Sequence, residues 1–444
     1  MKLPMPPPPL EQLFTAPPSE AIARMFMRPQ PALPDGRYLH WDELRHRTPP
    51  QGLSHQEWWW GTRMARLAQA QALPLQDKEG QPFSYALVAP VVQSLHFIDR
   101  DTSGLILADG PLATSQDQDR YLVSSLIEES ITSSQLEGAS TTRRVAEDML
   151  RAGRRPNTSS ERMIFNNYQA MRHIREIGKE ALSPALILEL HRMLTHDTLD
   201  DPADAGRLRK GDDIHVVDPK DNQLLHIPPA AALLPERLET LCAFANAGEE
   251  ETTYVHPLVR AILLHFMLGY DHPFTDGNGR TARAVFYWAL SRHGYWLMEY
   301  LSISSILRRA PAQYARAYLY TETDAGDTTY FLIHQFGVIR QAVEALQTFL
   351  NDKTREMRAT EKRLRSAELR DRFNHRQIAL LGHALKHPDA AYTMESHRAS
   401  HAVTYATARS DLLRLVEVGL LREGRQGRRF LFTVPEDLGA RLSR

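Results

Sequence analysis

The stretch His272-Pro-Phe-Thr-Asp276-Gly-Asn-Gly-Arg280-Thr-Ala-Arg283 decides how this chain is interpreted. An apolar helical period that starts after His256-Pro257 predicts a helix ending at His272, and a second helix is expected over Thr281 to His293. Between them, Gly277-Asn-Gly279 allows backbone conformations that point successive N–H groups into one concavity. Because the positive end of the second helix dipole faces the same place, the expected guest is a phosphate.

The polar side chains of this stretch predict what happens to that phosphate. Arg280 and Arg283 lie three residues apart, so their guanidinium groups can bracket two phosphate groups. Asp276 offers a hard oxygen ligand for Mg²⁺, and His272 can take a proton from an attacking hydroxyl. Phe274 is expected to face inward and anchor the loop. A plain glycine turn with solvated arginines is the alternative, and the fixed offsets between two helices favour phosphoryl-group chemistry.

The stretch resembles the signature of the Fic family, HxFx[D/E]GNGRxxR, and matches it at every specified position. The resemblance extends over roughly residues 120–350. It implies a protein adenylyltransferase that moves AMP from ATP to a Ser, Thr or Tyr hydroxyl of a protein, with His272 as the base and Asp276 holding Mg²⁺. It also implies that ATP, the default donor over UMP or phosphocholine, is bound by Phe274, Thr275, Asp276, Gly277, Asn278, Gly279, Arg280 and Arg283.

A second motif lies upstream. Ser133-Ser-Gln-Leu-Glu137-Gly138 resembles the inhibitory pattern [S/T]xxxE[G/N] of many Fic proteins, and Ser133 and Glu137 are spaced to share one helix face, on a helix expected at about 121–138. The resemblance implies that Glu137 binds Arg283 and takes the space of the γ-phosphate. An ordinary surface glutamate is the alternative, and a third interpretation has Glu137 position a water that removes AMP.

A hairpin is expected between Asp213 and Ile227, where two short β runs flank a polar turn. The resemblance implies that it is a flap that holds a target protein by strand addition, with Ile214, His215 and Val216 as contact residues. Downstream, Tyr314 and the stretch 327–331 resemble helices that line the adenine side, although core packing explains them equally well.

The whole chain is predicted to be mainly α, with a Fic-type helical core, a β-hairpin flap and a C-terminal winged helix-turn-helix. In the C-terminal part, three helices precede a hairpin with glycines at its turn, and residues 404–429 carry polar and arginine side chains that suit DNA. Such modules also bind proteins. The expected divisions are a Pro-rich arm at 1–40, an N-terminal region without an assigned role at 41–118, the Fic domain at 119–350, a linker helix at 351–370 and the winged helix at 371–444.

Bulk properties set the outer limits. The 444 residues exceed one ordinary core, and the 42% hydrophobic and 24% charged residues are typical of a folded globular protein. A formal net charge of −1 leaves nucleic-acid binding to local patches. Cys242 is the single cysteine, so an intrachain disulfide is excluded. The most apolar stretch, 261–270, is too short for a membrane span and no secretory signal is evident, so we expect a cytoplasmic protein without a membrane partner.

Two classes of function remain open on the sequence. In the first, the chain is a self-inhibited enzyme that modifies a protein, itself included, alone or as a homodimer. In the second, it is a DNA-binding regulator whose nucleotide pocket senses ATP. His272 favours the first, because a sensor needs the anion cradle and the arginines but no base. A long helix that begins near Trp58 and continues through Ala72 is also expected, with the tryptophans 58–60 buried.

Overall fold

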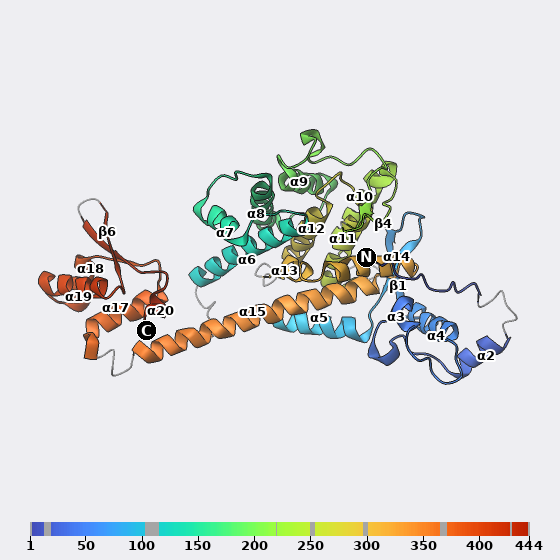
Figure 1. Cartoon of the computed structure of the whole chain (residues 1–444), viewed down its shortest axis with the longest axis horizontal. Helices are drawn as coiled ribbons and strands as arrows, with labels where there is room; N and C mark the ends of the chain where they lie inside the picture. Colours follow the sequence, from blue (N-terminus) through green and yellow to red (C-terminus); the bar gives the residue numbers. More distant parts are fainter. Residues whose placement is uncertain are drawn as a thin grey trace. The chain divides into compact units, whose positions relative to one another are not determined.

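The structure is a computed structural model, and it is mainly helical (Figure 1). The chain divides into two compact units, Met1–Leu346 and Gln347–Arg444, and the division falls inside the helix α15 (Thr329–Leu364). The residues that the structure describes are 2–12, 19–102, 115–218, 220–248, 254–295, 301–364, 371–426 and 429–442.

The N-terminal part of the first unit combines short helices with a β-hairpin. Its elements are α2 (Ser19–Met27), η1 (Pro34–Gly36), α3 (Trp41–Leu44), α4 (His55–Leu67), β1 (Ala70–Gln76), β2 (Pro82–Ala86) and α5 (Ala89–Thr102). The predicted helix through Ala72 is wrong at its end, because α4 stops at Leu67 and β1 begins at Ala70. Tertiary pairing decides this, since Ala70 and its successors pair antiparallel with β2 while Leu73 and Leu75 turn into the core.

The predicted burial of the three tryptophans is confirmed. Trp58, Trp59 and Trp60 form a hydrophobic cluster with Met25 and Leu39. A capping box between Ser54 and Glu57 starts the helix that carries the tryptophans, and Glu57 also pairs with Arg24 of α2 at 2.6 Å. Part of the Pro-rich arm is therefore helical and packed, which its proline content alone did not predict.

A buried charged network joins this N-terminal part to the turn before α15. Arg63 lies 3.3 Å from Asp324 and 3.2 Å from Asp327, and all three side chains are at most 7% exposed. Tyr38 donates to Asp327 at 2.5 Å, and Arg66 donates to Tyr330 at 2.8 Å. The stretch 327–331 thus packs against residues 38–66, which favours the core-packing interpretation over a nucleotide-lining one.

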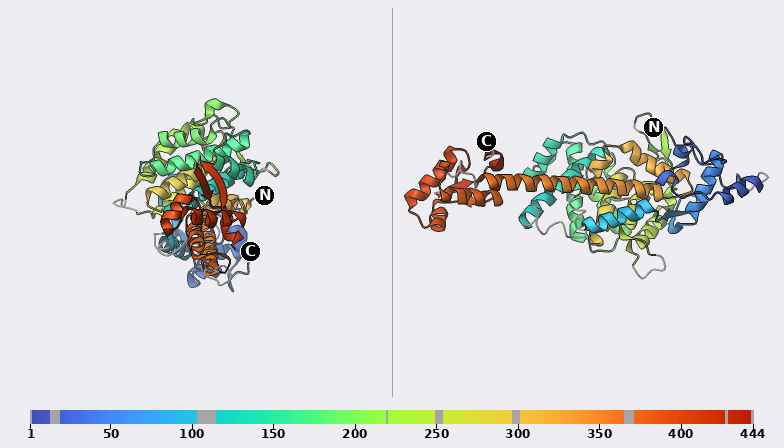
Figure 2. Two further views of the ribbon diagram at one scale, coloured as in Figure 1. Left: turned by 90° about the vertical axis from the view of Figure 1, so that its left-hand side faces the viewer. Right: turned by 90° about the horizontal axis from the view of Figure 1, so that it is seen from below.

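The centre of the first unit is a helical bundle around α11 and α12. Its elements are α6 (Ser115–Leu136), α7 (Arg143–Ala152), α8 (Ser159–Ile177), α9 (Pro184–Thr195), η3 (Pro202–Asp204), β3 (Val216–Val217), β4 (Leu224–His226), η4 (Ala231–Leu233), α10 (Leu234–Asn246), α11 (Pro257–Asp271), α12 (Asn278–Arg292), α13 (Ile303–Leu307), α14 (Pro311–Thr323) and α15. Helix α12 packs on α11, α8 and α9, and α6 packs on α8 and α13. The helix α5 runs alongside the first half of α15, where Arg340 lies over the Phe97 ring (Figures 1 and 2).

Local sequence explains where several of these elements begin. Ser183 caps α9 by accepting from the Leu186 N–H, and Pro184 takes the first helical position, as predicted. The predicted hairpin is confirmed, because Val216 and His226 face each other in an antiparallel pair. Among the described residues, no helix is long and apolar enough to traverse a bilayer.

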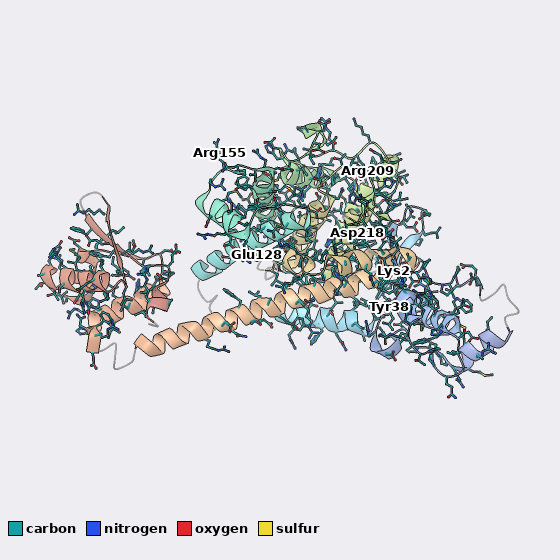
Figure 3. The ribbon with its side chains drawn as sticks, in the orientation of Figure 1. Lys2, Tyr38, Glu128, Arg155, Arg209 and Asp218 are labelled. Atoms are coloured by element: carbon teal, nitrogen blue, oxygen red, sulfur yellow. The ribbon has the colours of Figure 1, made fainter. Side chains whose placement is uncertain are left out.

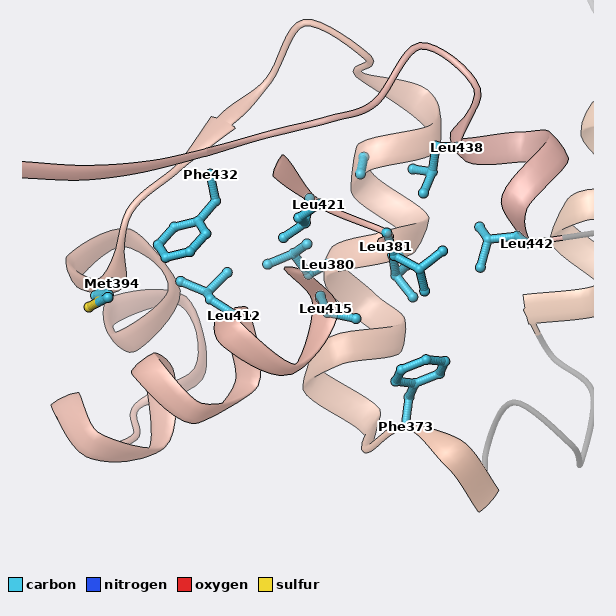
Figure 4. Packing of buried hydrophobic residues seen from close by; sticks show 12 residues of the cluster. Phe373, Leu380, Leu381, Met394, Leu412, Leu415, Leu421, Phe432, Leu438 and Leu442 are labelled. Atoms are coloured by element: carbon cyan, nitrogen blue, oxygen red, sulfur yellow. The ribbon is translucent and has the colours of Figure 1, made fainter. Parts of the chain in front are cut away.

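The second unit has an element order that is compatible with the predicted winged helix. Its elements are α17 (His375–Lys386), β5 (Ala391–Tyr392), α18 (Met394–His401), α19 (Tyr405–Glu417), β6 (Arg422–Gln426), β7 (Arg429–Thr433) and α20 (Leu438–Arg441), with the strands in the order β5-β7-β6. Apolar side chains from all three longer helices and from β7 fill one core, including Leu381, Leu412 and Phe432 (Figure 4). Buried Asp411 of α19 accepts from Arg376 and Asn374 of the segment that starts α17.

Candidate active site

The loop 272–277 joins the two central helices through two left-handed residues. His272 ends α11 with φ 45° and ψ 57°, and Gly277 precedes α12 with φ 85°. The second helix was predicted from Thr281, but α12 already begins at Asn278, because the left-handed Gly277 lets the helix start within the glycine turn. No side chain caps this helix, so the N–H groups of its first turn, around Gly279, remain the positive end of a fifteen-residue dipole.

Side chains clamp the backbone of this loop in place. The Asn278 amide accepts from the Phe274 N–H and donates to the Phe274 carbonyl, both at 2.9 Å. His191 stacks on the buried Phe274 ring, with ring centroids 3.7 Å apart. Its Nδ1 accepts from the Gly206 N–H at 2.9 Å, so its Nε2 carries the proton and donates to the Asp276 carbonyl, also at 2.9 Å. The loop is therefore fixed before any ligand arrives.

The two arginines of the motif have different surroundings. Arg280 is 1% exposed; it donates to the Leu194 carbonyl and, at 3.0 Å, to the Asp276 carboxylate. Arg283 donates through Nε to the Ser133 hydroxyl at 2.9 Å and through Nη2 to the Ser133 carbonyl at 3.1 Å. Arg280 is thus fixed at the loop, while Arg283 is held by the end of α6.

Glu137 lies over the start of α12, beside Gly279. Its Oε1 is 2.8 Å from Arg283 Nη2, and a Cβ added to Gly279 would overlap the same carboxylate. Burial opposes the charged form of Glu137, but the neighbouring Arg283 and Arg280 outweigh it and hold the pKa of this carboxyl below its ordinary value. Gly138, which follows, has φ +94°, a conformation that suits glycine. An anionic side chain therefore occupies the place that was predicted for a phosphate.

His272 is neutral at physiological pH. Burial lowers the pKa of its imidazole to about 4. Its Nδ1 lies 3.3 Å from the Gly269 carbonyl, which can only accept, so the proton belongs on Nδ1 and the lone pair on Nε2. This tautomer leaves Nε2 free to take a proton.

Comparison with known proteins agrees with this geometry, since residues 181–290 match the model of the Fic/DOC family, a segment that includes the whole loop. This segment is a Fic domain. It is 37% identical over 110 residues to the protein adenylyltransferase Fic of Nematostella vectensis and 37% identical over 115 residues to that of Drosophila melanogaster. Each match covers 24% of this chain, and the chain spans 23% and 20% of the length of these two relatives.

A solved structure shares the fold over a longer stretch. The crystal structure of a Fic family protein from Desulfovibrio desulfuricans G20 matches 79% of this chain and 98% of its own, with a TM-score of 0.53 and 19% sequence identity. The shared fold thus reaches well beyond the 110 residues of the Fic domain.

In the Fic domain, Asp276 has the chemistry of a magnesium ligand. Its side chain is 57% exposed, and only one of its oxygens accepts from Arg280. It stands beside the start of α12, so a cation bound there would also reach a phosphate. Magnesium in phosphate sites commonly uses one or two carboxylates together with the phosphates, and no cluster of three or more acidic, His or Cys side chains was found among the described residues. Asp276, one exposed carboxylate beside the start of α12, fits this mode of magnesium binding.

The helix α6, whose end holds Ser133 and leads into Glu137, is anchored by a buried acid. Glu129 of α6 accepts from the Ser302 hydroxyl at 2.8 Å, from the Ser304 N–H at 3.1 Å and from the Ser304 hydroxyl at 2.5 Å. Burial raises the pKa of Glu129 despite these donors. Ser133 and Glu137 follow Glu129 at intervals of four residues, so the contact with α13 sets the position of the contact with Arg283.

The hairpin of β3 and β4, which was predicted to be a flap, lies close to the C-terminal end of α11. His226 of β4 contacts the Tyr270 carbonyl through Nε2 and Glu322 through Nδ1, each at 2.7 Å. Of the predicted contact residues, His215 is exposed, and Ile214 and Val216 are half-buried. Within the described residues β3 pairs with β4 alone, which leaves the other edge of β3 unpaired.

Sequence reasoning missed the residues that support the site from elsewhere in the chain. His191, Arg209 and Glu129 are distant from the motif in sequence, and no local pattern marks them. Glu129 and His191 share one signal, a polar side chain on a helix face that is otherwise buried, whereas Arg209 lies in an irregular segment and has no such signal. Tyr314, for which an adenine-lining position and core packing were both open, contacts buried His265 at 2.8 Å.

Proposed function

We propose that this protein transfers AMP from ATP to a serine, threonine or tyrosine hydroxyl of a protein, and that Glu137 restrains this activity. The observation that carries the proposal is the Glu137 carboxylate bound to Arg283 over the uncapped start of α12. Because a carboxylate is held at this position, the start of α12 together with Arg283 favours anionic oxygen atoms. The names of the relatives, protein adenylyltransferase Fic, supply ATP and protein as the substrates.

The proposed step is one displacement at phosphorus. The target hydroxyl oxygen forms a bond to the α-phosphorus of ATP, and the bond from that phosphorus to the α–β bridging oxygen breaks, so pyrophosphate leaves. The hydroxyl proton moves to His272 Nε2, which the Nδ1–H tautomer leaves unprotonated. The first-turn N–H groups of α12 and the guanidinium of Arg283 stabilise the negative charge of the phosphates.

Magnesium bound at Asp276 would neutralise charge on the phosphate oxygens. The remaining loop residues hold the backbone in place. Phe274 is fully buried against His191, so we assign it a structural role. We assign the phosphate contacts to Thr275 and to the backbone of residues 277–280.

Restraint follows from competition for one guanidinium. While Glu137 holds Arg283 at 2.8 Å, a triphosphate must displace that carboxylate or bind without Arg283. Ser133 supports this state because it accepts from the same guanidinium. The same carboxylate could orient a water for the reverse reaction, the removal of AMP, and the assay below separates the two directions.

A protein target suits the flap. An extended segment can add to the unpaired edge of β3 through backbone hydrogen bonds, beside Ile214, His215 and Val216. This mode leaves the target hydroxyl free to approach His272. The chain itself is a candidate target, because a segment of a second copy can present the same backbone.

Labelled ATP tests the proposal directly. Wild type, Glu137→Gly, Glu137→Gly/His272→Ala and an exposed-glutamate control, Glu423→Gly, are incubated with α-labelled ATP and Mg²⁺. Label on protein should increase at least about tenfold in Glu137→Gly, disappear with His272→Ala and stay at the wild-type level in the control. An unlabelled Glu137→Gly protein, alone and with cell extract, would refute AMP transfer. Loss of AMP from pre-labelled target by wild type but not by Glu137→Gly would favour removal.

DNA binding by the second unit is a second candidate function. The observation that favours it is the exposed face of α19, where Tyr405, Arg409 and Ser410 are all exposed while Leu412 and Leu415 are buried. A gel shift of the full chain with duplex DNA should weaken steeply with salt and with Arg409→Ala. No shift at low salt would exclude this function.

A further inference from the structure

We propose that Arg209 is a positioning residue that couples the base of the flap to the backbone of His272. This inference rests on the proposed function, in which His272 is the base and the flap holds the target. Arg209 is 5% exposed and lies just before the flap in sequence. Its place in the first unit is labelled in Figure 3. Each of its three guanidinium nitrogens has a hydrogen-bond partner, and these partners come from both sides of the site.

One side of Arg209 closes the base of the flap. Its Nη1 donates to the Gly211 carbonyl at 2.7 Å and to Asp212 at 3.0 Å, both before β3. Its Nη2 donates to the Pro229 carbonyl, after β4. Asp212 in turn accepts from the Ala231 N–H at 2.6 Å. The two ends of the flap are therefore tied together through one guanidinium.

The other side of Arg209 holds the catalytic loop. Its Nε donates to the His272 carbonyl at 3.0 Å, and its backbone N–H donates to the Pro273 carbonyl at 2.9 Å. His272 has φ 45°, a left-handed conformation that costs a non-glycine residue about 1 kcal/mol or more. A charged donor on the carbonyl of that same residue helps to maintain the conformation from which the imidazole reaches its target.

The position also suits a positive charge. The His272 carbonyl is at the C-terminal end of α11, where the helix dipole is negative, so a guanidinium is favoured there. The same charge is one of the groups that keep the His272 imidazole unprotonated, after the larger effect of burial. Lysine would keep the charge but cannot donate in three fixed directions. Arg209→Lys therefore separates the role of the charge from that of the hydrogen bonds.

The consequence is that movement of the flap and the geometry of the general base, His272, are linked. A target that orders the flap also restrains the His272 backbone. When the flap becomes mobile, the His272 backbone becomes mobile with it. In contrast, the clamp by Asn278 and His191 acts on Phe274 and Asp276, further along the loop, and does not involve the flap.

The test compares Arg209→Lys and Arg209→Gln with Arg207→Gln, all in the Glu137→Gly background. Arg207 is exposed and two residues away, so it is the matched control. We expect kcat for AMP transfer to fall by about tenfold to a hundredfold in both Arg209 variants, with the dissociation constant for ATP within about twofold of the parent. The acid limb of the pH profile should move up in Arg209→Gln and stay in Arg209→Lys, while Arg207→Gln changes neither.

Hydrogen exchange measured by mass spectrometry gives a result that does not need activity. Peptides of the flap and peptides spanning 270–276 should both exchange faster in the Arg209 variants than in the parent. In Arg207→Gln both sets of peptides should exchange at the parent's rate. Faster exchange in the flap alone, or an unchanged kcat in folded Arg209→Lys, would overturn the coupling. If the Arg209 variants do not fold, Asp212→Ala, at an exposed carboxylate, is expected to raise exchange in both segments, and a change confined to the flap refutes the proposal.

A failure of the function itself gives a different pattern. If Glu137→Gly transfers no AMP, the proposed function fails, yet joint exchange of the flap and the loop still supports Arg209 as their link. If Glu137→Gly is active and the two segments respond independently, the function stands and the coupling fails.

Discussion

Arg283 Nη2 lies 2.8 Å from Glu137 Oε1 across 146 residues of sequence, and the same guanidinium donates to Ser133. Three hydrogen bonds from Arg283 thus end on one turn of chain at the end of α6. Glu129 of α6 fixes this turn through its hydrogen bonds to Ser302 and Ser304 at α13. The position of the Arg283 guanidinium therefore depends on helices that do not belong to the loop.

Glu129→Gln should weaken the restraint by Glu137. The glutamine oxygen can still accept from the Ser302 hydroxyl and the Ser304 N–H, but its NH₂ group then faces the Ser304 hydroxyl, which must reorient to accept, so the anchor of α6 weakens by about 1 kcal/mol. We expect AMP transfer by the otherwise wild-type protein to rise several-fold in the α-labelled ATP assay. Glu128→Gln, at the adjacent and less buried position, is the control. An unchanged or lower activity in Glu129→Gln would argue against this anchor.

The pH profile of Glu137→Gly should lack a step near neutrality. Burial lowers the pKa of His272 to about 4, so the imidazole is already the unprotonated base at pH 6, and activity is lost only as the pH falls toward 4. A histidine with an ordinary pKa would lose about fourfold between pH 7.5 and 6.0. The check is kcat/KM at fixed ionic strength across that interval, and a fourfold decrease would contradict the environment described for His272.

His191→Phe should reduce ATP affinity without removing a charge. Phenylalanine keeps the stack on Phe274 but loses the bonds to the Gly206 N–H and the Asp276 carbonyl, which leaves two backbone groups unpaired. A loss of about 1–3 kcal/mol is expected, measured as a decrease in ATP affinity and in Tm. The exposed His196, changed to Phe, is the control, and equal affinities in the two variants would exclude a supporting role.

Arg63→Ala should destabilise the first unit far more than loss of a surface pair does. Removal of Arg63 leaves the carboxylates of Asp324 and Asp327 buried without their cation, for which about 3–5 kcal/mol is expected. Arg37→Ala breaks an exposed pair with Glu43 and should cost less than about 1 kcal/mol.

The destabilisation by Arg63→Ala should also depend on pH. Burial raises the pKa of Asp324, and loss of Arg63 raises it further, so a fall in pH protonates the unpaired acid and relieves part of the cost. The difference in unfolding free energy between wild type and variant should shrink from pH 7.5 to pH 5.5. Urea unfolding at both values measures it, and a constant difference would show that the charge is compensated elsewhere.

The sequence predicted a glycine-containing loop between two helices because the signals for it are local. His272, Asp276 and Arg283 occur at fixed offsets around that loop, so spacing alone places them in one short stretch of chain. The boundary of α12 was missed because Gly277 adopts a conformation that starts a helix directly, which spacing cannot distinguish from a longer turn. Arg209 was missed because its role depends on contacts with carbonyl groups far away in sequence.

The N-terminal region shows the same limit. The tryptophans 58–60 were correctly expected in a core, since large aromatic side chains rarely stay exposed. The end of α4 and the strand β1 depend on pairing with β2, and Arg63 finds its partners more than 250 residues later. Long-range pairing of this kind leaves no periodic signal in the chain.

The network around Arg63 also bears on what can fold by itself. Arg63 pairs with Asp324, and Tyr38 donates to Asp327. Arg237, which pairs with Asp271 at the end of α11, donates to the carbonyls of Gln76 and Asp77. A fragment cut to the matched segment 181–290 would leave Arg237 without these carbonyls, and one begun at α6 would also leave Asp324 and Asp327 without Arg63 and Tyr38. The matched segment, taken by itself, therefore lacks hydrogen-bond partners that residues 38–86 supply in the whole chain.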